Sequence, residues 1–321
     1  MTRSCRRSSA GCRSPSSHSG SRATATSAPE RVLQRLDWQV IRRLDGLLQG
    51  DYRSLFHGNG LDLAALREYQ PGDDVRYIDW NVTARMDTPY VREYHEDREI
   101  TAWFLLDLSP SVDFGTVDTD REKRTVLVDF VTTLARLLTR RGNRVGAIFY
   151  GGQVEHTIPA RGGRDQVLRL IQDLLGQPRL NGTPPTDLKP LLDTANQALK
   201  RRSLVVIVSD FISEPGWDRS LQLLQRRHEV LAVRLIDPRE TDLPDVGPII
   251  MEDNETGEQL YVDTGNAQFR RRFQAAAEAR EATINAAFQR AGVEAAVLST
   301  DDDLVRAIIR MAMLRRRRRT A

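Results

Sequence analysis

The chain has 321 residues, of which 40% are hydrophobic and 28% charged, so it can bury a large core and is too apolar to be disordered throughout. No apolar run approaches the roughly 20 residues of a membrane-spanning helix, and no apolar core follows the basic start as in a signal peptide. We therefore expect a cytoplasmic protein without a membrane span. Both cysteines, Cys5 and Cys12, lie near the N-terminus, which excludes thiol catalysis and cysteine-bound zinc in the rest of the chain.

The net charge of +3 comes from the two ends of the chain. Ten of the 47 basic residues are arginines within residues 1–29 or the run Arg315–Arg319, which leaves 37 basic against 44 acidic residues. We expect residues 1–29 to be a disordered basic tail, because they carry little apolar surface to bury, and 315–321 to be a basic C-terminal tail. Basic ends suit nucleic acid, but the acidic body disfavours that partner, and arginines also suit a helix C-terminus.

Residues 30–100 predict an N-terminal helix followed by a small β-rich insert. Apolar residues recur on one helical face between Arg31 and about Leu48, and Gly50 follows as a helix end. The run Leu66–Trp80 contains a Pro-Gly-Asp-Asp turn signal. Pro89–Ile100 then alternates as a strand does.

From residue 101 strands alternate with helices, which predicts an α/β fold with a doubly wound, mostly parallel sheet. The expected strands are Thr101–Asp107, Arg144–Tyr150, Val154–Ala160, Leu204–Ser209, Val230–Ile236 and Glu294–Leu298. The expected helices are Arg121–Arg141, Asp165–Leu175, Asp187–Lys200, Trp217–Arg227 and Asn266–Arg290. Ile249–Val262 resembles a hairpin, and Thr300 with Asp303 predicts a capping box for a last helix.

Oxygen-bearing side chains follow two of these strands. Asp107, Ser109 and Ser111 form an Asp-x-Ser-x-Ser motif after the first strand, and Asp210 follows the most apolar strand. Between them, Thr183 and Thr186 precede a helix. Ligands of open α/β sheets bind at the carboxyl ends of strands, and hard divalent cations prefer oxygen ligands. Each piece alone is also ordinary turn chemistry, but their combination predicts a metal site.

The run from Leu66 to Trp80, with Ala84-Arg85 and then the Asp-x-Ser-x-Ser motif, resembles domain of unknown function family 58. The motif itself resembles the metal-ion-dependent adhesion site of von Willebrand factor A domains, which implies such a domain over residues 101–314. The resemblance implies metal ligation by Asp107, Ser109, Ser111 and Asp210. Thr186 is preferred over Thr183 as the fifth ligand, because it stands in a Thr-Asp-Leu sequence at a helix start. The implied cofactor is Mg²⁺, with Mn²⁺ or Ca²⁺ as alternatives.

The resemblance also implies a partner and a role. Such proteins are similar to companions of MoxR-type AAA+ ATPases, which act in chaperone-like assembly or maturation of other proteins. The implied function is a non-enzymatic adaptor whose metal binds an acidic residue of the ATPase or of an unknown client.

Two other functions compete with this interpretation. A metal-dependent hydrolase of the haloacid dehalogenase kind needs a second aspartate where Ser109 stands, and a serine nucleophile elbow needs glycines where Leu108 and Pro110 stand. A nucleic-acid-binding protein would use the basic termini.

A second polar group lies in the β-rich insert. Asp73, Asp74, Arg76, Asp79 and Arg85 form either a second binding surface or a structural cluster. We favour the structural role, in which Asp73 and Asp74 shape a turn and Arg76 and Arg85 pair with the acids.

Overall fold

The computed structural model of the protein describes residues 27–47, 62–95, 99–114, 122–180, 185–252 and 258–320. The central strands are β3 (Thr101–Asp107), β4 (Arg144–Tyr150), β5 (Val154–Arg161), β6 (Leu204–Ser209), β7 (Glu229–Ile236) and β10 (Ala295–Ser299). They form one sheet in the order β10-β7-β6-β3-β4-β5. All neighbours pair in parallel except β5, which pairs antiparallel with β4. The predicted α/β fold with a mostly parallel sheet is confirmed.

The order of the strands reverses at β3. After β3 the chain adds β4 and β5 on one side, then returns to place β6, β7 and β10 on the other. Loops that leave β3 and β6 therefore diverge to opposite faces, and such a reversal point is where ligands of open α/β sheets bind. Asp107 ends β3 and Asp210 directly follows β6, so the topology brings both to the reversal point.

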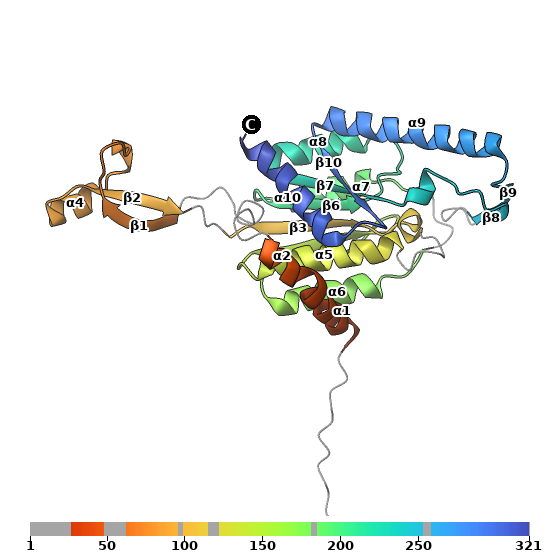
Figure 1. Cartoon of the computed structure of the whole chain (residues 1–321). Helices are drawn as coiled ribbons and strands as arrows, with labels where there is room; N and C mark the ends of the chain where they lie inside the picture. Colours follow the sequence, from red (N-terminus) through yellow and green to blue (C-terminus); the bar gives the residue numbers. More distant parts are fainter. Residues whose placement is uncertain are drawn as a thin grey trace, which may run out of the picture.

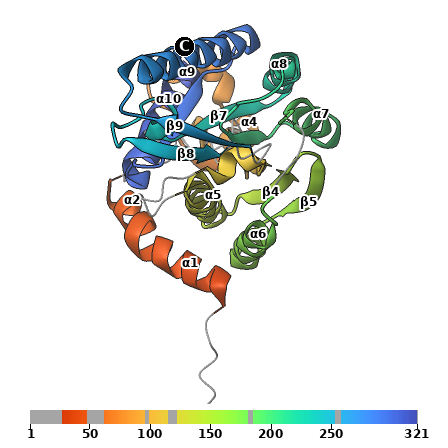
Figure 2. The ribbon, with the colours of Figure 1, turned by 90° about the vertical axis from the view of Figure 1, so that its right-hand side faces the viewer.

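Helices cover both faces of the sheet (Figures 1 and 2). One face carries α1 (Ala28–Leu36), η1 (Asp37–Ile41), α2 (Arg42–Leu47), α5 (Lys123–Thr139), α6 (Arg164–Gly176) and α10 (Leu304–Thr320). The other carries α7 (Lys189–Ala198), α8 (Trp217–Arg227) and α9 (Ala267–Ala291). Successive strand residues point to opposite faces, so Phe104 and Leu106 pack in the first core while Leu105 packs in the second. A strand covered on both faces must be apolar throughout, as β6 is.

The N-terminal helix begins earlier than predicted. Ser27 and Glu30 form a reciprocal capping box, which satisfies backbone donors at the helix start. Residues 27–29, predicted as tail, therefore belong to this helix and its cap. Its apolar stripe packs in the first core through Leu33 and Leu36, and Arg35 pairs with Asp129 of α5. The predicted end at Gly50 lies outside the described residues.

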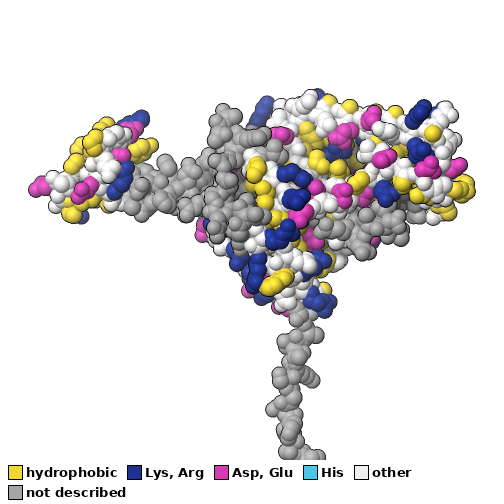
Figure 3. All heavy atoms as spheres, viewed as in Figure 1, with side chains coloured by type: hydrophobic (Ala, Val, Ile, Leu, Met, Phe, Trp, Pro, Cys, Tyr) yellow, Lys and Arg dark blue, Asp and Glu magenta, His cyan; other side chains and the backbone are white. Residues whose placement is uncertain are grey.

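The insert contains more structure than the sequence predicts. Strand β1 (Asp62–Glu68) pairs antiparallel with β2 (Tyr90–His95), and η2 (Val75–Tyr77) and α4 (Trp80–Met86) lie between them. Figure 1 shows this unit to one side of the body, and Figure 3 shows hydrophobic and charged side chains mixed on its surface. Helix α4 was not predicted, because its seven residues are too few for a helical periodicity.

The last helix, α10, differs from the prediction in its cap and in its length. Thr300 does not cap the last helix, because its hydroxyl donates to Asp237 Oδ2 at 2.8 Å. Asp303 caps it instead, accepting the N–H groups of Val305 and Arg306. Helix α10 continues to Thr320, so most of the predicted C-terminal tail is helical.

The predicted hairpin consists of β8 (Pro248–Glu252) and β9 (Gln259–Asp263), and its turn at 254–257 lies outside the described residues. None of the helices in the described part of the chain is both long and apolar enough to cross a membrane.

Replacing Leu33 by Ala tests whether the N-terminal helix is part of the core. We expect the free energy of unfolding to fall by about 2–5 kcal/mol, because the change removes a fully buried side chain. Urea denaturation measures this change. The matched control Gln34→Ala alters an exposed neighbour and should stay within about 0.5 kcal/mol. Equal stability of the two variants would contradict the docking of this helix.

Candidate metal centre

Asp107 lies at the end of β3 with its side chain completely buried. Its Oδ1 accepts the backbone N–H of Ser109 at 3.0 Å, and its Oδ2 accepts the hydroxyl of Ser209 at 2.6 Å. Ser209 is the last residue of β6, so the second bond joins the two strands at which the strand order reverses. The carboxylate is thereby fixed between the loops that follow β3 and β6.

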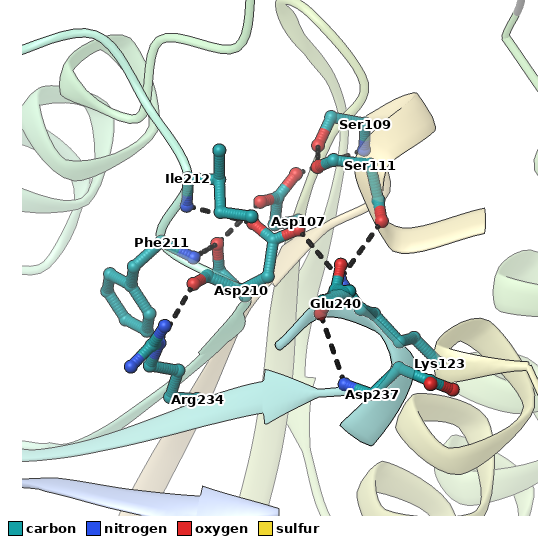
Figure 4. A network of polar contacts seen from close by, with 11 residues as sticks. Asp107, Ser109, Ser111, Lys123, Asp210, Phe211, Ile212, Arg234, Asp237 and Glu240 are labelled. Carbon is teal, nitrogen blue, oxygen red and sulfur yellow. Dashed lines mark hydrogen bonds and ion pairs between the residues drawn. The ribbon is translucent and has the colours of Figure 1, made fainter. Parts of the chain in front are cut away.

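The two serines of the motif lie side by side. Pro110 starts the short helix η3 (Pro110–Asp113), whose fixed proline backbone suits a helix start. Ser109 occupies the cap position, but its hydroxyl does not cap the helix. Instead its Oγ lies 3.1 Å from Oγ of Ser111. The local turn therefore brings two hydroxyls together beside Asp107 (Figure 4).

Asp210 enters the same site from β6 and is 1% exposed. Its Oδ1 accepts the N–H of Ile212 at 3.0 Å, and its Oδ2 accepts the ammonium of Lys123 at 3.2 Å. The next residue, Phe211, has a φ of 60°, a left-handed conformation that costs energy for a bulky side chain. Its N–H donates to Ser209 Oγ at 2.9 Å. The Ser209 hydroxyl therefore bonds both to the turn at Phe211 and to Asp107.

Thr186 lies on the loop that leads into α7 (Lys189–Ala198). It is 2% exposed, and its carbonyl accepts the N–H of Glu214 from the loop after β6 at 2.8 Å. The N–H of Asp187 donates to the hydroxyl of Tyr150, which pairs with Asp107 in the sheet, at 3.2 Å. The alternative Thr183 lies outside the described residues.

The structure adds three residues that sequence reasoning missed, namely Ser209, Lys123 and Glu240. Lys123 is fully buried at the start of α5, and its Nζ lies 2.5 Å from Glu240 Oε1. Glu240 belongs to η4 (Pro238–Glu240), 117 positions away, so no local pattern predicts this contact. Ser209 directly precedes Asp210, and a polar residue at the end of an otherwise apolar strand was the available signal.

Burial dominates the electrostatics of the cluster. Burial, and after it the nearby charge of Asp210, raises the pKa of Asp107 to about 6. For Lys123, burial opposes the charged form, but the carboxylates of Asp210 and Glu240 outweigh it and raise the pKa. Burial raises the pKa of Glu240 against the stabilising charge of Lys123. Asp210 and Glu240 thus share one ammonium, and Asp107 is not among its partners. The resulting excess of negative charge makes the site attractive to a further cation.

These donors fit a hard divalent cation better than a soft one. Among the described residues, no three His, Cys, Asp or Glu side chains gather in one place, so zinc-type or all-carboxylate cages are absent from that part of the chain. The site instead combines carboxylates of Asp107 and Asp210 with the hydroxyls of Ser109 and Ser111. Mg²⁺ and Mn²⁺ accept such oxygen sets together with water.

The polar group of the insert is largely structural. Asp73 accepts two bonds from Arg67 at 2.8 and 2.7 Å, and these bonds lower the pKa of Asp73 to about 2. Asp74 pairs with Arg76 at 2.6 Å. Asp79 caps α4 by accepting the N–H groups at positions 81 and 82.

The predicted role of Arg85 is not supported. Arg85 is exposed, and Arg67 instead of Arg85 pairs with Asp73. Arg67 lies in β1, only six positions before Asp73, whereas Arg85 lies in α4. The nearer arginine therefore pairs with the turn.

The family model for the protein of unknown function DUF58 matches residues 65–283. The chain belongs to this family. An uncharacterized protein of Mycobacterium bovis and one of Mycobacterium tuberculosis are each 37% identical to it over 288 residues, covering 89% of both chains. The range matched to DUF58 includes most of the insert and all the predicted ligands, so the candidate site lies within the family's common region.

Solved structures resemble the DUF58 fold only distantly. The conserved hypothetical protein BatB from Bacteroides thetaiotaomicron is 12% identical, with a TM-score of 0.45, and the match covers 68% of this chain and 99% of that one. An aerotolerance-related membrane protein from Bacteroides fragilis is 14% identical, with a TM-score of 0.44 and the same coverage. At this level the likeness carries no argument about function.

Replacing Ser209 by Ala tests the bond between β6 and Asp107. We expect a loss of about 1–3 kcal/mol in the free energy of unfolding, because a buried carboxylate oxygen and the N–H of Phe211 lose their shared partner. Urea denaturation again provides the measurement. Thr283→Ala removes an exposed hydroxyl from α9 and serves as the control. A loss of unfolding free energy no larger than that of the control would contradict a stabilising role of the Ser209–Asp107 bond.

Proposed function

We propose that this DUF58 protein binds one divalent cation, foremost Mg²⁺, at the ends of β3 and β6 and uses it to bind another protein. Asp107, Ser109, Ser111, Thr186 and Asp210 are the proposed ligands, on a domain of the von Willebrand factor A type. In this proposal the site binds a partner and does not catalyse a reaction.

The environment of Asp107 carries the proposal. This carboxylate is fully buried, yet its partners are neutral groups, namely the hydroxyls of Ser209 and Ser109 and the backbone N–H of Ser109. Within the described part of the chain no Lys, Arg or His forms an ion pair with it. Burying an unpaired charge is costly, and proteins usually offset that cost with a counter-ion or a metal. Two neighbouring hydroxyls and a second carboxylate then supply further oxygen ligands.

The composition of the site also favours binding over hydrolysis. Hydroxyl ligands are neutral, so a cation bound through them and few carboxylates keeps a net positive charge. A carboxylate of a partner protein is a natural last ligand for such a cation. Position 109, where the haloacid dehalogenase type of hydrolase needs an acid–base aspartate, holds a serine whose hydroxyl lies against Ser111.

The proposed partner is a MoxR-type AAA+ ATPase, which the family resemblance implies. The chain would act as an adaptor between that ATPase and a client protein during assembly or maturation. An acidic residue of the ATPase or the client would complete the shell of the cation.

Calorimetric titration with MgCl₂ and MnCl₂ tests the metal. We expect the wild type to bind with a dissociation constant in the millimolar range or tighter, and Asp107→Asn to weaken binding by about tenfold or more. Asp173→Asn on α6, where Asp173 contacts His156, should bind as the wild type does. Equal binding by Asp107→Asn and the wild type would place any metal elsewhere.

Co-purification tests the partner. With the MoxR-type ATPase of the same organism, we expect retention in MgCl₂ and loss in EDTA or with Asp107→Asn. A nucleic-acid partner would instead show binding that falls steeply with salt and ignores EDTA, and that pattern would replace the adaptor proposal.

A further inference from the structure

Lys123 places a permanent cation inside the candidate metal centre. Its side chain is completely buried, and its Nζ lies 3.2 Å from Asp210 Oδ2, 2.5 Å from Glu240 Oε1 and 3.3 Å from the carbonyl oxygen of Ser111. An ammonium group has three N–H donors, so each donor meets one oxygen. The three acceptors come from the loop after β6, from η4 and from η3 (Figure 4).

Two features of its position disfavour a charged lysine at residue 123. It is the first residue of α5, and a cation near a helix N-terminus opposes the helix dipole. A buried ammonium also loses its hydration, at a large cost unless it is paired. The ring of Phe114, with its centroid 5.7 Å from Nζ, adds only a weak attraction. The carboxylates of Asp210 and Glu240 must therefore offset most of these costs.

Lys123 divides the cluster into two halves. Asp210 and Glu240 share the ammonium as their ion-pair partner, whereas Asp107 has only dipolar partners. Two acceptors of the ammonium, Asp210 and the carbonyl of Ser111, belong to residues that the proposed metal would also use. A divalent cation and the ammonium would thus be close neighbours of like charge within one buried site, where charges interact strongly.

We propose that Lys123 is a built-in counter-cation, which holds Asp210 and Glu240 in place when no metal is bound and lowers the affinity of the centre for a divalent cation. This inference rests on the proposed metal binding. It explains why the site can remain folded without metal, and it makes metal binding weak enough to depend on a ligand from the partner.

Removing the ammonium should tighten metal binding. In calorimetric titration with MgCl₂, we expect Lys123→Met to bind about tenfold more tightly than the wild type, because a repelling charge is lost while all proposed ligands remain. Lys189→Met removes a partly exposed lysine that pairs with Asp193 on α7 and should leave the affinity unchanged. Unchanged or weaker binding by a folded Lys123→Met variant overturns the inference.

Thermal unfolding gives a second readout. Without metal, Lys123→Met leaves Asp210 and Glu240 uncompensated, so its melting temperature should fall below that of the wild type. Added MgCl₂ should then raise the melting temperature of the variant more than that of the wild type, because binding to the native state stabilises it. A smaller or equal response of the variant contradicts the proposal.

A matched pair covers the case in which Lys123→Met does not fold. Glu240→Gln and the double variant Lys123→Met/Glu240→Gln differ only by the ammonium, and the double variant carries no unpaired charge at position 240. We expect the double variant to bind Mg²⁺ about tenfold more tightly than Glu240→Gln, and equal affinities overturn the inference.

The failure of this inference is distinguishable from failure of the proposed function. Mg²⁺ binding that depends on Asp107 but not on Lys123 would refute only the proposed role of Lys123. If neither the wild type nor any variant binds Mg²⁺, both the inference and the proposed function are refuted.

Discussion

The parallel pairing of β3 with β6 is the constraint on which the rest of the site depends. It brings Ser209 to Asp107 across 102 positions of sequence and joins them by a 2.6 Å hydrogen bond. Because the strand order reverses here, the following loops diverge to opposite faces of the sheet. Helices on both faces exclude water from the strands. Asp107 and Asp210 are consequently buried, and each needs a partner within the protein or a bound cation.

The cluster meets that need in two ways. Asp210 and Glu240 are paired with Lys123, so a cation of the chain itself offsets part of the negative charge of this half. Asp107 is held by hydroxyls and a backbone N–H, which orient the carboxylate without cancelling its charge. The contrast links packing to function, because the two adjacent hydroxyls of Ser109 and Ser111 lie beside Asp107. Removing Lys123 or Asp107 therefore has opposite expected effects on metal binding.

The run from Leu66 to Trp80 carries the resemblance to the family, yet the bonds of its aspartates lie within the insert. Bidentate pairing with Arg67 and local pairing with Arg76 fix the turn at Asp73 and Asp74. Asp79 stabilises α4 as its cap. A motif can thus be highly specific for a family because it encodes a local fold. The metal-site proposal consequently rests on the strand ends and draws no support from this run.

The sequence by itself determined the alternation of strands and helices, the hydrophobic stripe of the first helix, and the oxygen-rich ends of β3 and β6. These features are local, since periodicity and turn residues act over a few positions. Helix α4 and the true cap at Asp303 were missed because short helices and competing hydroxyl partners give weak signals. Only the tertiary structure decided that Ser209 clamps Asp107 and that Lys123 and Glu240 enter the site, because these contacts join segments about a hundred residues apart. Strand order creates that proximity, and no spacing along the chain records it.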